Sequence, residues 1–165
     1  MNVRPATPSD VPLIAALIRT HAARAEMLPR PLPAIWAALP DFVVGVWGGR
    51  VVACGSLEHY SPLEAEVRSL AVEAGARGLG CGSSVVQALV SEAQRRGTCR
   101  LFALTRAVPF FRRLGFVPAN RSCFPDKIAK DCLGCARRDC CDETAVVLHL
   151  ATGAGSLYCT EQHAS

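Results

Sequence analysis

A glycine-rich run between a strand and a helix is the feature that most constrains this chain of 165 residues. The run Arg77-Gly78-Leu79-Gly80-Cys81-Gly82 follows the strand-like stretch 66–72 and opens a helix. Glycines at alternate positions let the backbone approach a bound group closely, and the helix start directs N–H groups and the positive dipole end toward one point. The run therefore predicts a site for a diphosphate. A glycine-rich turn without a ligand is the alternative interpretation.

Two familiar nucleotide loops do not fit this run. A dinucleotide loop needs a third glycine after a longer gap and an acidic residue on the next strand, and a nucleoside triphosphate loop needs a lysine. The run resembles instead the acetyl-CoA motif of the GNAT family of N-acetyltransferases, in which Arg or Gln is followed by two residues, Gly, one residue, then Gly or Ala. Arg77, Gly80 and Gly82 match that motif, and the stretch 108–116 resembles the family's short helix that ends in Gly-Phe.

Periodicity and turn residues supply the other elements. We expect strands at 2–6, 42–47, 50–58, 66–73, 99–105, 116–117 and 144–150, and helices from Thr7 to about Leu28, at 35–39, at about 79–96 and around Phe110. Gly48-Gly49 predicts a hairpin. With the resemblance, this order implies an α/β (α+β) GNAT fold: a mixed, mostly antiparallel sheet flanked by helices, with splayed central strands. We expect one domain over residues 1–150, with a Cys-rich insertion at about 123–143 and a disordered tail at 151–165.

Charge and hydropathy narrow the choice of partners. Eighteen basic and 14 acidic residues give a formal charge of +4. The basic residues are scattered, so a nucleic acid is not an expected partner, whereas an anionic cofactor and an anionic substrate suit the charge. No run is long enough to span a bilayer and no secretory signal is visible, so we expect a cytoplasmic protein without a membrane partner. A homodimer is compatible with the sequence.

The resemblance to the GNAT family also implies which residues contact acetyl-CoA. In that family, the strand before the glycine run binds the pantetheine arm through its backbone. The matching positions are Leu70, Ala71 and Val72 for the arm, Arg77, Gly78, Leu79, Gly80, Cys81, Gly82 and Ser83 for the diphosphate, and Phe111 in the short helix.

Acetyl transfer needs a neutral amine, so a base must remove a proton directly or through water. Glu66 is the leading candidate, because Ala65-Glu66-Val67 resembles the Ala-Glu-Ile of histone-acetylating members, where that Glu is the base. A solvated strand-end carboxylate is the alternative, and Glu58 is the second candidate base. Many members protonate the leaving thiolate with a Tyr in the short helix, where this chain has phenylalanines. Tyr60 is a weaker candidate for that role.

A more specific resemblance concerns the acceptor. The stretches 27–30, 54–58, 65–72, 101–106 and 124–127 are similar to short, stand-alone bacterial amino-acid N-acetyltransferases of the N-acetylglutamate synthase type. That similarity implies acetylation of the α-amine of glutamate, the first step of arginine biosynthesis. Two carboxylates must then be held, and guanidinium groups pair with carboxylates through two hydrogen bonds. Arg106 is the preferred acceptor-binding residue, with Arg68, Arg30 and Lys127 as the other candidates. A solvated surface cation is the alternative for each.

Two other functions remain open. One is acetylation of a protein terminus, a lysine side chain or a small amine. The other is a catalytically silent acetyl-CoA sensor, which the missing Tyr would allow.

Cysteine is unusually frequent, with nine residues. In a reducing compartment this favours free thiols or metal ligands over disulfides. Within the insertion, Cys132, Cys135, Cys140 and Cys141 predict a structural zinc site, although four residues between the pairs is short for one. Free thiols or a redox-sensitive disulfide are the alternatives.

Overall fold

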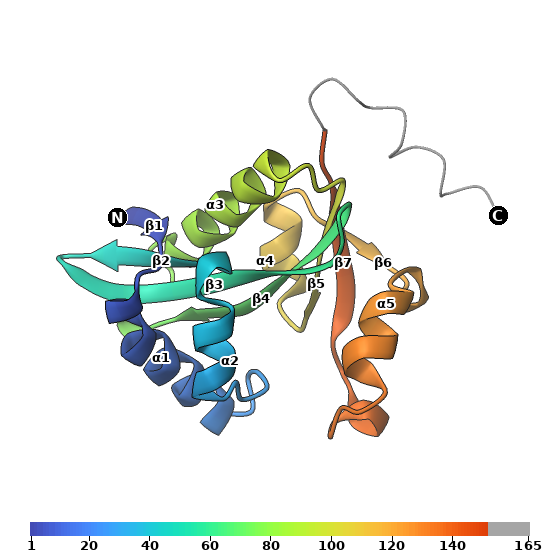
Figure 1. The fold of residues 1–165 in the computed structure, drawn as a ribbon, viewed down its shortest axis with the longest axis horizontal. Coiled ribbons are helices and arrows are strands. Elements are labelled where there is room, and N and C mark those ends of the chain that lie inside the picture. Colours follow the sequence, from blue (N-terminus) through green and yellow to red (C-terminus); the bar gives the residue numbers. More distant parts are fainter. Residues whose placement is uncertain (152–165) are drawn as a thin grey trace. The chain divides into compact units, whose positions relative to one another are not determined.

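The computed structural model of the chain describes residues 1–151, so the predicted tail lies outside the described residues except for Ala151. Its α-helices are α1 (Val11–Ala23), α2 (Leu32–Ala37), α3 (Cys81–Arg95), α4 (Val108–Arg113) and α5 (Pro125–Lys127) (Figure 1). Its strands are β1 (Asn2–Pro5), β2 (Phe42–Trp47), β3 (Arg50–Ser61), β4 (Glu64–Val72), β5 (Arg100–Thr105), β6 (Val117–Ala119) and β7 (Thr144–His149). No helix in this part of the chain is long and apolar enough to cross a membrane.

The strands form one mixed sheet of seven, in the order β1-β2-β3-β4-β5-β7-β6. The pairs β1–β2, β2–β3, β5–β7 and β6–β7 are antiparallel, and β4–β5 is parallel. The parallel ladder joins only Glu64–Glu66 to Arg100–Phe102, although β4 continues to Val72 and β5 to Thr105. This mixed, mostly antiparallel sheet with a short central ladder confirms the predicted fold class.

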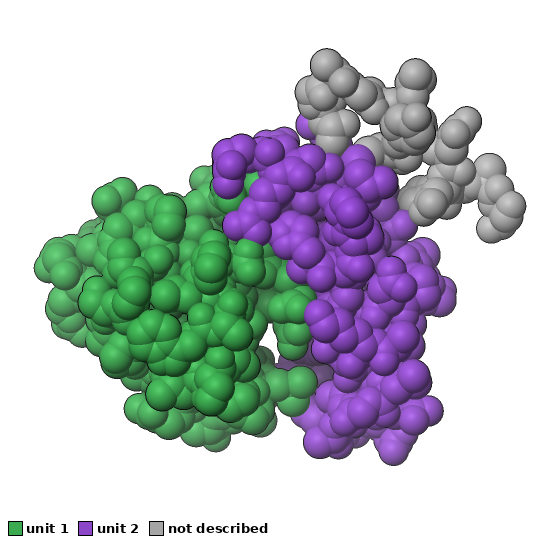
Figure 2. Space-filling view, in the orientation of Figure 1, with its two compact units in different colours: residues 1–58, 67–92 green, residues 59–66, 93–165 purple. Residues whose placement is uncertain are grey.

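The contacts divide the chain into two compact units, which are coloured separately in Figure 2. Unit 1 comprises Met1–Glu58 and Val67–Glu92. Unit 2 comprises residues 59–66 and the chain from Ala93 onward. The boundary between the units falls within β3, β4 and α3, each of which contributes residues to both. The single domain expected over residues 1–150 stays a prediction.

Unit 1 has a core between α1, α2 and the sheet. Ile14, Ile18 and Ile35 are fully buried against Phe42 and Val44. The helical spacing of Leu13, Ile14, Leu17 and Ile18 predicts an apolar stripe on α1, and this prediction is wrong for Leu13, which is exposed. The predicted hairpin is confirmed: Gly48 and Gly49 join β2 to β3 with φ of +57° and +78°, the left-handed backbone that such a turn requires.

One glycine of β3 lets α3 approach the sheet. A Cβ atom added to Gly55 would lie 2.9 Å from Cγ1 of Val85 and 3.1 Å from Cδ1 of Leu89. Both side chains are fully buried. The absence of a side chain at Gly55 therefore fixes where the helix that follows the glycine run can lie.

Unit 2 is built around aromatic residues. Phe102 of β5 stacks on Phe124 with ring centroids 4.2 Å apart, and both are fully buried. Phe124 precedes α5, and a π-helical segment, Ile128–Cys132, follows it directly. Phe124 thus anchors the start of the insertion at 123–143 in the core of unit 2.

Candidate active site

The glycine run has the backbone expected of a tight loop that leads directly into a helix. A 3-10 turn, Ala74–Ala76, precedes it, and Gly78 and Gly80 have φ of +80° and +81°. A Cβ at either glycine would meet nothing within 4 Å, so the left-handed backbone and not crowding requires glycine there. Leu79 between them is exposed. The run leads into the 15-residue helix α3, whose first N–H groups have no partner within the helix itself.

The arginine of the run is not a free cation. Arg77 donates to Glu26 at 2.7 Å, and Glu26 also lies 2.7 Å from Nδ1 of His21. The hydrogen bond from Arg77 lowers the pKa of Glu26. Nε2 of His21 lies 3.0 Å from the carbonyl oxygen of Val72. This chain of contacts ties the glycine run and the end of β4 to the end of α1.

The predicted pantetheine-binding stretch occupies the end of β4. Ala71 is buried, while Leu70 and Val72 are half-buried. The side chains of this stretch therefore contribute to packing. Such packing is compatible with the predicted role, in which the backbone and not the side chains would bind the pantetheine arm. Phe111, the predicted cofactor contact in α4, is buried in unit 2 and makes edge-to-face contacts with Phe110 and Phe116 at 5.1 Å each.

Two of the four predicted acceptor-binding cations meet in unit 1. Arg30 donates to Oγ of Ser56 at 3.2 Å and to Oγ of Ser69 at 3.1 Å. Its guanidinium also lies 5.1 Å from the centre of the Phe42 ring. Glu58, the second candidate base, lies 3.8 Å from Arg30 and 3.9 Å from Arg68. We call Arg30, Arg68 and Glu58 the arginine cluster.

The other two cations have different neighbours. Arg106, which follows β5, pairs with Asp142 of the insertion at 2.7 Å. That hydrogen bond raises the pKa of Arg106 and lowers the pKa of Asp142. Lys127 lies in unit 2, is 94% buried and pairs with Glu66 at 2.9 Å. Lys127 therefore neighbours the predicted base.

Glu66 belongs to a buried polar cluster in unit 2. Tyr60 Oη lies 2.8 Å from Oε2 of Glu66 and 2.5 Å from Oδ2 of Asp131. Lys127 Nζ lies 2.9 and 3.0 Å from the same two oxygens. Tyr60, Glu66, Lys127 and Asp131 form what we call the carboxylate cluster. Asp131 was not among the predicted site residues, although its spacing of four from Lys127 is one at which an ion pair can form on a helix.

The predicted zinc site is not supported. Among residues 1–151, no three Cys, His, Asp or Glu side chains are grouped so that they could hold a metal ion. Cys132, Cys135, Cys140 and Cys141 carry free thiols. Cys141 accepts a hydrogen bond from Arg121 at 3.2 Å, and Cys135 accepts one from the backbone of Arg137 at 3.4 Å. The preference for free thiols has one exception in the described part, since Cys99 is disulfide-bonded.

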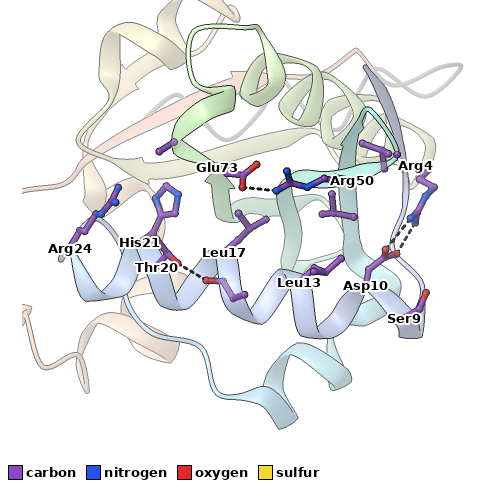
Figure 3. Close-up of a pocket in the computed structure, with 15 residues that line it drawn as sticks. Arg4, Ser9, Asp10, Leu13, Leu17, Thr20, His21, Arg24, Arg50 and Glu73 are labelled. Carbon is purple, nitrogen blue, oxygen red and sulfur yellow. Dashed lines mark hydrogen bonds and ion pairs between the residues drawn. The ribbon is translucent and has the colours of Figure 1, made fainter.

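A cleft of about 590 Å³ in unit 1 contains none of the predicted site residues. Figure 3 shows Leu13, Leu17 and Thr20 of α1 along one side and Arg50 with Glu73 on the other. Two ion pairs line it, Arg4 with Asp10 at 2.7 Å and Arg50 with Glu73 at 3.0 Å, and so do the side chains of His21 and Arg24. Both ring nitrogens of His21 have neighbours, Nδ1 in Glu26 and Nε2 in the carbonyl group of Val72.

Comparison with known proteins identifies the class that this fold and these residues define. Residues 15–116 match the acetyltransferase (GNAT) family. A Chlorobaculum tepidum protein named as an uncharacterized N-acetyltransferase, CT2212, is 34% identical over 145 residues, which cover 88% of this chain and 94% of that protein. An amino-acid acetyltransferase of Mycobacterium tuberculosis is 35% identical over 117 residues, covering 69% of this chain and 67% of its own length. The chain belongs to the GNAT family and is an N-acetyltransferase.

A solved structure extends the comparison to the cofactor. N-acetylglutamate synthase of Neisseria gonorrhoeae, complexed with coenzyme A and L-arginine, superimposes with a TM-score of 0.73 at 26% identity. The match covers 90% of this chain and 33% of that one. The predicted likeness to amino-acid acetyltransferases is thereby confirmed. A glycine run with two left-handed glycines and an open approach at the start of a long helix fits a diphosphate-bearing cofactor of this kind.

Proposed function

We propose that this chain transfers the acetyl group of acetyl-CoA to the α-amine of an amino acid, with L-glutamate as the favoured acceptor. The arginine cluster is the observation that carries the proposal. Two guanidinium groups beside one carboxylate match an α-amino acid, which presents a carboxylate and an ammonium group together. The second carboxylate of glutamate gives a further partner to the same pair of cations.

Arg30 is the better positioned of the two cations. Ser56, Ser69 and the Phe42 ring hold its guanidinium from separate elements, and its side chain is 14% exposed. A cation fixed before binding loses less side-chain entropy when it captures a carboxylate. We therefore assign acceptor binding first to Arg30 and Arg68, and Arg106 stays a predicted acceptor-binding residue. Lys127 is reassigned to the carboxylate cluster.

Residues 77–83 would hold the diphosphate of acetyl-CoA, and Leu70–Val72 would bind its pantetheine arm. The co-substrate supplies an acetyl thioester, whose thiol titrates near about 8.5 and so leaves readily as a thiolate. We assign removal of the amine proton to Glu66, directly or through water. Phe110 and Phe111 leave α4 without a proton donor, so no acid is assigned there.

A thiol-release assay over the standard amino acids tests the acceptor. We expect turnover with glutamate to exceed turnover with glutamine and aspartate. Turnover only with peptides or simple amines would place the acceptor in another class. Binding of acetyl-CoA without turnover of any amine would make the chain a sensor.

The arginine cluster can be tested with matched substitutions. Arg30→Lys and Arg68→Lys keep the charge but lose the two-pronged geometry. Each should raise the KM for glutamate about tenfold or more while the KM for acetyl-CoA changes by less than about twofold. Arg19→Lys, an exposed position on α1, is the control. Equal changes in both KM values would remove the cluster from acceptor binding.

A further inference from the structure

The carboxylate cluster contains more groups than a single base needs. Tyr60 comes from the end of β3, Glu66 from β4, Lys127 from the end of α5 and Asp131 from the π-helical segment. The hydroxyl of Tyr60 and the ammonium of Lys127 both bridge the same pair of oxygens, Oε2 of Glu66 and Oδ2 of Asp131. Two carboxylates that would repel one another are thus held together by two bridging donors.

The two bridges differ chemically. The ammonium of Lys127 has three protons and can donate to both carboxylates at once. The hydroxyl of Tyr60 has a single proton, which it can donate to only one of them while its oxygen can accept a proton from the other. Lys127 therefore holds the geometry, and Tyr60 is the member through which a proton can pass.

Burial gives this passage a direction. The side chains of Glu66 and Lys127 are 5% and 7% exposed, whereas that of Asp131 is 24% exposed. The ring of Tyr60 is fixed by Phe102, with centroids 5.7 Å apart, and by the ammonium of Lys130 at 5.2 Å from its centre. A single hydroxyl group, that of Tyr60, therefore lies between a proton on buried Glu66 and the more exposed carboxylate of Asp131.

We propose that Asp131 conducts the proton taken up by Glu66 to solvent through the hydroxyl of Tyr60. This inference rests on the proposed function, in which Glu66 receives the amine proton. Glu66 gives its proton to the oxygen of Tyr60 as Tyr60 gives its hydroxyl proton to Asp131, and Asp131 releases that proton to water. Glu66 is then ionised again and Tyr60 is unchanged. Asp131 and Tyr60 are relay residues, and Lys127 is a positioning residue.

Steady-state kinetics of Asp131→Asn and Tyr60→Phe test the relay with full-length protein. Each change breaks the same path, so each should lower kcat about tenfold or more with the KM for acetyl-CoA altered by less than about twofold. The double variant should be no slower than the slower single variant, because one path can be interrupted only once. Asp131→Glu keeps a carboxylate and should recover part of the rate. Asp126→Asn, an exposed carboxylate on α5, is the control and should leave kcat unchanged.

A small diffusible base separates a relay from a purely structural role. Added imidazole should raise kcat of Asp131→Asn in proportion to its concentration and leave kcat of the unaltered enzyme constant. A lowered Tm and a lowered kcat without rescue by imidazole would overturn the relay. So would an unchanged kcat in Asp131→Asn. If that variant does not fold, Tyr60→Phe carries the same test.

Glu66→Gln, measured in parallel with whichever acceptor is turned over, distinguishes a failure of the relay from a failure of the assignment of Glu66 as the base. An inactive Glu66→Gln with a normal Asp131→Asn would refute the relay and leave Glu66 as the base. An active Glu66→Gln would refute the assignment of the base and the relay with it. A chain that acetylates no amine would refute both.

Discussion

The guanidinium of Arg30 donates a 3.1 Å hydrogen bond to Oγ of Ser69, a residue with φ of +53° inside strand β4. Two further contacts hold this part of the strand. Sγ of Cys54 donates to the carbonyl of Ser69 at 3.6 Å, and Oγ of Ser56 donates to the carbonyl of Arg68 at 3.3 Å. A left-handed backbone at a residue other than glycine costs about 1–3 kcal/mol and persists only where its surroundings enforce it. The proposed acceptor-binding arginine is thus also a support of the strand predicted to bind the cofactor.

Ser69→Ala and Ser69→Gly should separate the strain from the hydrogen bond. Ser69→Ala keeps the strain and removes the bond, so it should lower the free energy of unfolding by about 1 kcal/mol. Ser69→Gly removes the bond as well but relieves the strain, so it should be more stable than Ser69→Ala by about 1 kcal/mol. Urea unfolding measures both. Equal stability of the two variants would contradict a strained backbone at this position.

The glycine run allows a test with a matched control. Gly75, Gly78 and Gly80 each have open space around an added Cβ, but only Gly78 and Gly80 have a positive φ. Gly80→Ala should therefore distort the loop and weaken binding of coenzyme A about tenfold, whereas Gly75→Ala should leave it unchanged. Titration calorimetry with coenzyme A measures the affinities. Tight binding by Gly80→Ala would show that the loop backbone does not set the diphosphate site.

Local chemistry made much of the fold predictable. Gly48-Gly49 fixes a hairpin, and the alternating glycines before α3 fix a strand–loop–helix unit, because in both places the backbone itself demands particular residues. The prediction that Leu13 is buried was wrong because the helical apolar period of α1 does not determine the burial of each residue. Such a period indicates which residues share a face but not how wide the buried part of that face is.

The sites depended on contacts between distant residues, which no local pattern reveals. Tyr60 and Asp131 are separated by 71 positions, and Lys127 and Glu66 by 61. Asp, Glu and Lys are usually exposed, so no feature of the sequence indicates that these residues meet in a buried cluster. The same holds for Arg106, whose partner Asp142 lies 36 positions away in the insertion.

Two variants separate acceptor binding by Arg106 from its ion pair with Asp142. Arg106→Ala should raise the KM for glutamate far more than that for acetyl-CoA if Arg106 contacts the acceptor, because only the acceptor would lose a charge partner. Asp142→Asn removes the competing carboxylate and should lower the KM for glutamate or leave it unchanged. Equal changes of both KM values in Arg106→Ala would exclude Arg106 from acceptor binding.

Gly55→Ala should test how closely α3 approaches the sheet. The added methyl group would lie 2.9 Å from Val85, so the helix or the side chain must move, at a cost of about 1–3 kcal/mol in the free energy of unfolding. Val85→Ala removes the opposing atom. The double variant Gly55→Ala with Val85→Ala should therefore be more stable than the sum of the two single changes predicts. Additive losses in urea unfolding would mean that the helix adjusts without strain.

The ion pair of Arg4 and Asp10 should make the free energy of unfolding depend on pH in the acidic range. Oδ1 and Oδ2 of Asp10 accept bonds from Arg4 at 2.9 and 2.7 Å, and the backbone of Thr7 donates to Oδ2 at 2.7 Å. These bonds, chiefly that from Arg4, hold the pKa of Asp10 well below its usual value. Because the folded pKa lies below the unfolded one, the stabilisation is complete above about pH 5 and is lost as the pH falls below about 4. The free energy of unfolding of the unaltered chain should therefore exceed that of Asp10→Asn by a constant amount between pH 7 and 5, and the difference should shrink at lower pH. A difference that stays constant down to pH 3 would show that Asp10 stabilises the fold without its charge.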